Sequence, residues 1–135
     1  MQYKFSAYGH HNMLATHKTT LEFTKEAELT LKGDCIVGVK ADFELSELKK
    51  FIKSSNAKKI TIIISINEKI QEKINAELNP NFNSNRELVI RKTDFVSERT
   101  FAVKADKAAF ELSRELVKEM KKPETMASVA IEIKA

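Results

Sequence analysis

Residues 58–66 read KKITIIISI, and this stretch decides the fold. Successive side chains on a β-strand point to opposite faces, so isoleucines occupy one face at positions 60, 62, 64 and 66, while Thr61, Ile63 and Ser65 occupy the other. β-Branched residues also favour strands over helices. We therefore predict a central strand here, with the isoleucine face turned into the core.

Further strands are expected on both sides of this segment. Apolar and polar residues alternate at the start of the chain and again around Leu21 and Phe23, which is typical of strands with one buried face. The segments expected to form strands are 3–10, 20–24, 35–39, 87–92, 99–104 and 126–133, with 87–92 and 99–104 paired and joined through Thr93 and Asp94.

The first two strands are expected to pair as an antiparallel hairpin. Placing Phe5 opposite Leu21 joins two apolar faces. The same register sets Lys4 opposite Glu22, and opposite charges are favourable across neighbouring strands. The apolar face and the polar face of the two strands therefore favour the same register.

Two helices are expected to cover the strands, near residues 43–54 and 106–121. In the first, Leu45, Leu48 and Phe51 share one helical face. In the second, Asp106 is the expected N-cap and Pro123 ends the helix. Residues 68–78 are ambiguous, because their four-residue apolar spacing suits a helix or a strand, and local propensity favours a helix.

Length and composition bound the class of protein. With 135 residues, 42% of them hydrophobic and 31% charged, the chain is expected to form a single domain over residues 1–135. The expected fold class is α+β, mainly β. We expect two packed, largely antiparallel sheets in a sandwich-like arrangement, covered by the two helices.

The expected location is cytoplasmic, with no membrane partner. The chain has no apolar run of the roughly 18 residues that a membrane span needs. Its first residues lack the apolar core of a signal peptide, and the single cysteine, Cys35, has no internal disulfide partner.

The net charge of +4 is spread along the chain rather than gathered in a basic arm. One local excess exists, and it consists of Lys49, Lys50, Lys53, Lys58 and Lys59. This cluster lacks interleaved aromatic residues beyond Phe51 and any motif that reads bases. We expect it to serve solubility, and we do not expect specific nucleic-acid binding.

The familiar catalytic and cofactor motifs are missing from the sequence. It has no phosphate-binding loop, no glycine-rich dinucleotide motif, no paired cysteines and no nucleophile elbow. Polar residues with useful chemistry instead gather in the first 35 positions, and they are His10, His11, Asn12, His17, Thr19, Glu22, Asp34 and Cys35. The catalytic residues, the cofactor and the metal all stay unassigned.

These residues support a ligand-site hypothesis. The hairpin register turns His17 inward opposite Gly9 and places His10 on the other face, so the two imidazoles should not share a metal ion. Asp34 and Cys35 open the next buried strand, and Cys35 is a candidate nucleophile with His17 as its base. The alternative is a hydrogen-bonded core histidine and a buried structural thiol.

Arg91 and Arg99 are further candidates, because two guanidinium groups on adjacent strands can clamp a carboxylate or a phosphate. The alternative is an ordinary surface ion pair between Arg99 and Asp94. The complete set of candidate ligand-binding residues is His17, Asp34, Cys35, Asn12, Thr19, His10, Arg91 and Arg99, and His11 is expected to be exposed and dispensable.

Three motifs follow one another in the first third of the chain: GHHN at 9–12, THKTTLEFT at 16–24 and LTLKGDCIVGV at 29–39. With RKTD at 91–94, ADKAA at 105–109 and RELV at 114–117, this order resembles the archaeal domain-of-unknown-function family 371. The resemblance implies a β-sandwich-like domain with short helices, and it carries no established activity and no catalytic residue. It also implies an extended strand at residues 68–78.

Three classes of function stay open. The first is an uncharacterised domain that binds a small ligand or metal near the first hairpin and the turn at residues 33–35. The others are a protein-interaction module and a nucleic-acid-associated protein without catalysis. The sequence does not establish whether the protein is an enzyme, and it is compatible with a homo-oligomer.

Overall fold

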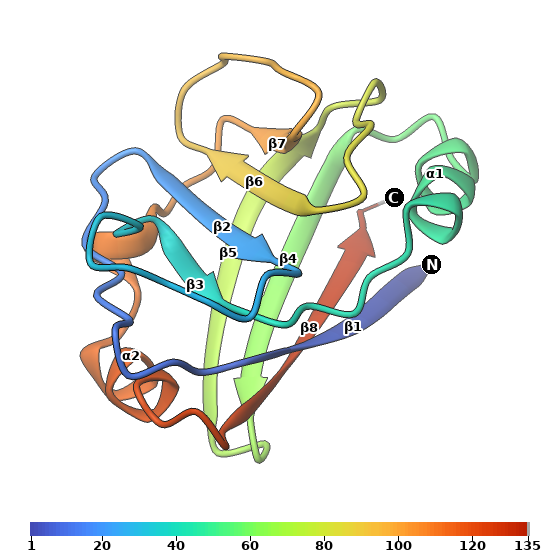
Figure 1. Ribbon diagram of the computed structural model, residues 1–135. Helices are drawn as coiled ribbons and strands as arrows, with labels where there is room; N and C mark the ends of the chain where they lie inside the picture. The colour runs from blue at the N-terminus through green and yellow to red at the C-terminus, as the bar shows by residue number, and fades with distance from the viewer. Residues whose placement is uncertain (135) are drawn as a thin grey trace.

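The computed structural model describes residues 1–134, which form strands and short helices (Figure 1). The elements are β1 Gln2–Tyr8, β2 Thr20–Thr24, β3 Ile36–Gly38, α1 Leu45–Lys53, β4 Lys59–Ile66, β5 Ile70–Leu78, β6 Glu87–Arg91, β7 Thr100–Val103, the 3-10 turn η1 Ala109–Glu111, α2 Arg114–Met120 and β8 Met126–Ile133. Among the described residues, no helix combines the length and the apolar character that crossing a membrane would require.

The strands form one mixed sheet with the order β1-β8-β4-β5-β7-β6-β2-β3. The expected α+β, mainly β class is confirmed, and most strand pairs are antiparallel, but a single eight-stranded sheet takes the place of two separate sheets. This sheet is rolled, so that β2 and β6 cross in front of β4 and β5 (Figure 1). Its two halves therefore enclose one hydrophobic core, to which residues of both contribute.

The two edges of the rolled sheet meet beside β3. Tyr8 and Val39 form an antiparallel bridge with backbone N–O distances of 2.7 and 2.8 Å. Gly38 makes this approach possible, because a Cβ atom there would lie 2.7 Å from the Cβ of Ala7 and 2.9 Å from the ring of Phe23. The absence of a side chain at position 38 thus lets both edges close over the core.

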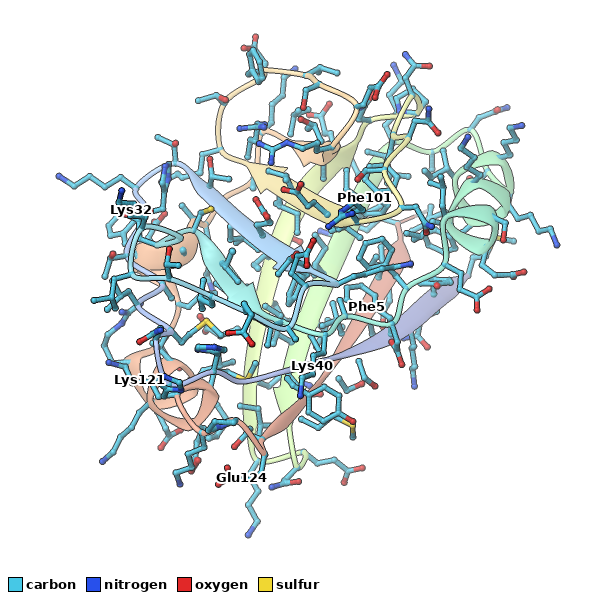
Figure 2. The ribbon with its side chains drawn as sticks, viewed as in Figure 1. Phe5, Lys32, Lys40, Phe101, Lys121 and Glu124 are labelled. Atoms are coloured by element: carbon cyan, nitrogen blue, oxygen red, sulfur yellow. The ribbon has the colours of Figure 1, made fainter. Side chains whose placement is uncertain are left out.

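Strand β4 lies centrally, as its sequence predicts, between β8 and β5. The isoleucines on one face are all buried, whereas Ile63 and Ser65 on the other face are half-buried. Ile62 lies opposite Ile74 on one neighbour and Ile131 on the other, which extends an apolar row across the sheet. In Figure 2, Phe5 and Phe101 lie in this interior, and Lys121 lies at the periphery.

The predicted hairpin between the first two strands is wrong. β1 pairs with β8, which places Phe5 opposite Val129, and β2 pairs with β6, which places Leu21 opposite Ile90. Alternating apolar residues match any strand with the same alternation, so the pattern selects a face and leaves the partner open. Phe5 and Phe23 still meet, because their rings pack edge to face across the core with centroids 5.4 Å apart.

The helix predicted near 43–54 is confirmed as α1, with Leu48, Phe51 and Ile52 buried. The helix predicted over 106–121 begins only at Arg114, as α2. The 3-10 turn η1 takes the place of its first part, and Ser113 caps α2 through the amide of Leu116. Asp106, the expected cap, instead accepts hydrogen bonds from the backbone and side-chain nitrogens of Asn75.

Residues 68–78 contain strand β5, as the family resemblance implies and against local helix propensity. Asn67 and Glu68 both have positive φ angles in the tight turn from β4, a conformation typical of hairpin turns. β5 then pairs with β4 from Ile70 to Glu77 and with β7 near its end. Tertiary pairing therefore overrides the weak preference of its charged residues for a helix.

Shortening a buried side chain of α2 should destabilise the protein. Leu116 is 1% exposed, so we expect Leu116→Ala to lower the free energy of unfolding by about 2–5 kcal/mol in urea unfolding. Leu31→Ala is the matched control, because Leu31 is 62% exposed and its truncation should change stability by less than about 0.5 kcal/mol. Equal stabilities of the two variants would contradict the packing of α2.

Candidate functional site

Strand β2 places a carboxyl group on the outer face of the rolled sheet. Leu21 and Phe23 point into the core and are fully buried, so the alternate residue Glu22 points outward. Glu22 is nevertheless only 6% exposed. A buried carboxyl is costly unless it finds partners within the protein. The surroundings of Glu22 therefore define the first candidate site.

The partners of Glu22 come from β6, β7 and the start of β3. Its carboxyl group is hydrogen-bonded to Glu87, and the thiol of Cys35 donates to its Oε1 at 3.8 Å. Burial and the Glu87 carboxyl raise the pKa of Glu22 to about 7, whereas the positive charge of Arg99 and the Cys35 thiol lower it. Near neutral pH the carboxyl of Glu22 therefore exchanges its proton.

Arg99 lies just before β7, and its Nη1 donates to Oε2 of Glu87. The surface ion pair expected between Arg99 and Asp94 is therefore replaced by a pair that reaches across to β6. This difference arises because β6 and β7 run parallel, with Val89 opposite Thr100, so residues 92–99 form a wide loop rather than a tight turn.

Arg91 is held in place on two sides. Its Nε donates to the Oγ1 of buried Thr100 at 3.0 Å, and its guanidinium carbon lies 4.9 Å from the centre of the Phe95 ring. Burial and the nearby charge of Arg99 lower the pKa of Arg91. Within residues 1–134, no acceptor forms a hydrogen bond with its two terminal amino groups. Thr100 and Phe95 thus fix the plane of the guanidinium group, and its outer edge has no protein partner within the described residues.

Cys35 does not have the character of a nucleophile. Burial, together with the negative charges of Glu22 and Asp34, raises the pKa of its thiol to about 12. The nucleophile is the thiolate, which this environment disfavours. In this arrangement Cys35 acts as a protonated thiol that donates a hydrogen bond to Glu22.

His17 lies beside the segment that contains Asp34. The carbonyl oxygen of Asp34 accepts hydrogen bonds from the backbone amides of Thr16 and His17 at 2.9 and 3.2 Å. The Nδ1 of His17 accepts from the backbone amides of Thr19 and Thr20. The ring therefore stabilises the entry to β2, and the carbonyl of Thr19 in turn accepts from the amide of Lys92, next to Arg91.

His10 and Asn12 lie outside the cluster around Glu22. The backbone amide of His10 donates to Met120 of α2, and the Nδ1 of His10 accepts from the amide of Asn12. The side chain of Asn12 donates to the carbonyl of Leu29, which ties this loop to a neighbouring one. His11 is exposed, as expected, and stacks on His10. Over the part of the chain that the structure describes, no group of three or more His, Cys, Asp or Glu residues is arranged to hold a metal ion.

The structure thus brings Cys35, Arg91 and Arg99 together around Glu22, and it adds residues that the sequence-based set omits. Glu22 could have been identified from the sequence, because a charged residue between two core residues of a strand is unusual. Glu87 and Thr100 could not have been identified in this way. They lie far from Glu22 in the sequence and approach it only through the pairing of β2, β6 and β7. We define the polar cluster as Glu22, Cys35, Glu87, Arg91, Arg99 and Thr100.

Comparisons with known proteins cover nearly the whole chain. The family described as "Domain of unknown function (DUF371)" matches residues 5–134. An uncharacterized protein of Methanocaldococcus jannaschii is 40% identical over 124 residues, which correspond to 90% of this chain and 92% of that protein. The matched region contains every element from β2 to β8 and every residue of the polar cluster.

The buried carboxyl should make stability depend on pH. Folding raises the pKa of Glu22 from 4.5 to about 7, so its stabilising contribution is complete below pH 4.5 and is lost as the pH rises through 7. Replacing Glu22 by Gln removes this titration. Relative to Glu22→Gln, the wild-type protein should lose on the order of 2 kcal/mol of unfolding free energy between pH 5 and pH 8.

Urea unfolding at several pH values measures this difference. Glu28→Gln is the matched control, because Glu28 is exposed and its replacement should leave the wild-type pH profile unchanged. Parallel profiles for wild type and Glu22→Gln would show that the Glu22 carboxyl is not perturbed by folding.

Proposed function

The chain belongs to the DUF371 family of domains of unknown function, and on that premise we propose that it binds a small molecule with a carboxylate or phosphate group at its polar cluster. The observation that carries the proposal is the open edge of Arg91. Thr100 and Phe95 fix the plane of this guanidinium group and leave its two terminal amino groups without a protein acceptor among residues 1–134. Such a fork matches the two oxygens of a carboxylate or phosphate.

The charges of the cluster also favour an anion. Arg91 and Arg99 are both cationic, and Glu87 neutralises one of them through its ion pair with Arg99. When Glu22 holds its proton, the cluster keeps one positive charge that lacks a counterion. An anionic ligand would supply that counterion, and its affinity should therefore rise as Glu22 becomes protonated.

Exposed apolar side chains on the loop after Arg91 support the proposal that the ligand also has an apolar part. Phe95 and Val96, on the loop between β6 and β7, are 60% and 51% exposed. Apolar side chains beside a few placed polar groups match the lining of small-molecule sites. We propose that the charged group of the ligand binds Arg91 and that its apolar part packs on Phe95.

His17, Thr19 and Asp34 remain candidate lining residues in this proposal. Thr20 lies opposite Arg91 in the ladder of β2 and β6, so the segment that leads into β2 runs alongside the end of β6. His10 and Asn12 are not part of the proposed site, because they are anchored to Met120 and Leu29. No catalytic role is assigned to any of these residues.

A protein-binding role for the same face is the second candidate. Phe110 is a further exposed aromatic residue, 45% exposed, and its ring lies 5.7 Å from the ammonium group of Lys92, which follows Arg91 in the chain. Aromatic residues flanked by cations are common in protein interfaces. This alternative predicts that small anions leave the cluster unoccupied.

Titration with benzoate tests the proposal, because this molecule combines a carboxylate with an apolar ring. In 1H–15N NMR spectra, benzoate should shift the Nε signal of Arg91 and the amide signals of residues 92–100. Arg91→Lys keeps the charge but loses the planar fork, so it should weaken binding by about tenfold. Arg86→Lys is the matched control, because exposed Arg86 pairs with Glu26 and is not part of the polar cluster, and this variant should bind benzoate like the wild type.

The dependence on pH provides a second check of the same site. Benzoate should bind more tightly at pH 6 than at pH 8, because Glu22 carries less negative charge at the lower pH. The proposal fails if benzoate shifts no signal of the cluster at either pH, or if Arg91→Lys and Arg86→Lys bind it equally well.

A further inference from the structure

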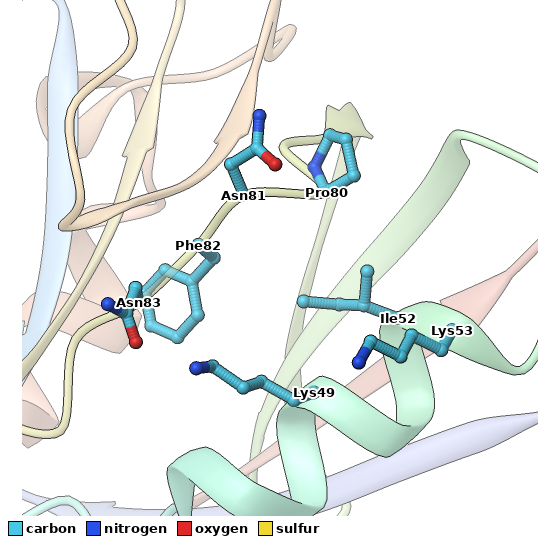
Figure 3. Close-up of a pocket in the computed structure, with 7 residues that line it drawn as sticks. All are labelled: Lys49, Ile52, Lys53, Pro80, Asn81, Phe82 and Asn83. Atoms are coloured by element: carbon cyan, nitrogen blue, oxygen red, sulfur yellow. The ribbon is translucent and has the colours of Figure 1, made fainter.

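A hollow lies between helix α1 and the chain segment that follows β5 (Figure 3). It has a volume of about 280 Å³ and shares no residue with the polar cluster. Helix α1 contributes one wall and the segment at 80–83 contributes the other. The lining residues are Lys49, Ile52, Lys53, Pro80, Asn81, Phe82 and Asn83.

The wall opposite the helix is rigid because buried groups hold it. Asn79 is buried, and its Nδ2 donates to the carbonyl of Thr100 at 2.8 Å while its Oδ1 accepts from the amide of Asn81. Phe82 is buried too, and its ring packs edge to face on Phe101 at 5.3 Å. The hollow is therefore formed before any ligand arrives, which lowers the entropic cost of binding.

The helix supplies two positive charges to this hollow. Lys49 and Lys53 are one turn apart on α1, and within residues 1–134 neither forms an ion pair. Figure 3 shows the ammonium group of Lys49 extended toward Phe82 and Asn83. Lys50, which does not line the hollow, is paired with Glu47 at 3.6 Å. Like charges at this spacing repel each other, so an anion between them would relieve the repulsion.

The hollow continues along an apolar surface. Ile52, Lys53 and Pro80 also line an adjoining hollow of about 460 Å³, whose wall includes Ala57 and Leu78. The two hollows together form a groove whose apolar floor continues past Pro80 to Ala57 and Leu78, and Lys58 adds a third lysine at that end. Volumes of this order are typical of small-molecule sites, which measure about 300–1,000 Å³.

We propose that this groove binds a small organic phosphate. The phosphate group lies between Lys49 and Lys53, and the side-chain amide of Asn83 donates a further hydrogen bond to it. The carbon skeleton of the ligand packs against Ile52 and Pro80. A nucleic acid is disfavoured as the occupant, because the aromatic residue of the hollow, Phe82, is buried and offers no face on which a base can stack.

The probe for this site is n-butyl phosphate, with inorganic phosphate as its truncated form. In 1H–15N NMR titrations, butyl phosphate should shift the amide signals of residues 49–53 and 80–83 and should bind at least about fivefold more tightly than inorganic phosphate. The double variant Lys49→Ala/Lys53→Ala should weaken butyl phosphate binding by about tenfold or more.

Lys50→Ala is the matched control, because it removes the same charge from the same helix but not from the groove, and it should bind like the wild type. Circular dichroism and thermal unfolding verify that the double variant stays folded. A charge-preserving variant, Lys49→Arg, provides a readout that is independent of folding, since it should retain binding within about threefold.

Two sources of such a phosphate are separated by a second assay. Sedimentation with phosphatidylglycerol vesicles that requires Lys49 and Lys53 would assign the phosphate to a lipid headgroup, whereas binding of soluble butyl phosphate alone would assign it to a metabolite. The proposal is overturned if Lys50→Ala weakens binding as much as the double variant does. It is also overturned if the perturbed signals lie around Arg91 rather than along α1, or if a single-stranded oligonucleotide binds through these lysines and displaces butyl phosphate.

Discussion

Strand β2 is buried on both of its faces and paired along both of its edges, and the outer half of the molecule is arranged around this constraint. β6 and β3 occupy its edges, and Leu21 and Phe23 fill the core on its inner face. The outer face is therefore almost closed to water at its centre, where Glu22 is 6% exposed. A carboxyl group at such a position has to be satisfied by protein groups, and the polar cluster is the set of groups that does so.

A buried ionisable group of this kind is costly, and the cluster reduces the cost without removing it. Arg99 and the thiol of Cys35 stabilise the charged carboxyl, while burial and Glu87 favour the protonated form. The result is an acid that exchanges its proton near neutral pH, beside an arginine with an open edge. Groups with strongly perturbed pKa values gather at functional sites more often than elsewhere. The same constraint that closes the fold therefore supplies the chemistry on which the proposed anion site depends.

The buried face of a single strand or helix could be predicted from the sequence. The strand with which it pairs could not. The isoleucine face of β4 and the apolar face of α1 follow from local periodicity alone. The pairing of β1 does not, because Phe5 meets an apolar neighbour equally well on β2 or on β8. Asp106 has the chemistry of a helix cap but finds Asn75 instead. Cys35, Arg91 and Arg99 could be named as candidates, yet their common centre, Glu22, emerges only when three strands are in register.

The burial of the Glu22 carboxyl is tested most directly by the titration of this side chain, followed through its 13C carboxyl signal in the folded protein. Burial beside Glu87 predicts that the signal changes with a midpoint near pH 7, the pKa of about 7 that this environment produces. The Glu87→Gln variant should move the midpoint downward, because it removes the competing carboxylate and leaves Arg99 nearby. A midpoint close to the ordinary value of 4.5 in the wild-type protein would contradict the account, since it would mean that the carboxyl of Glu22 is solvated and that the polar cluster is not a buried, proton-exchanging site.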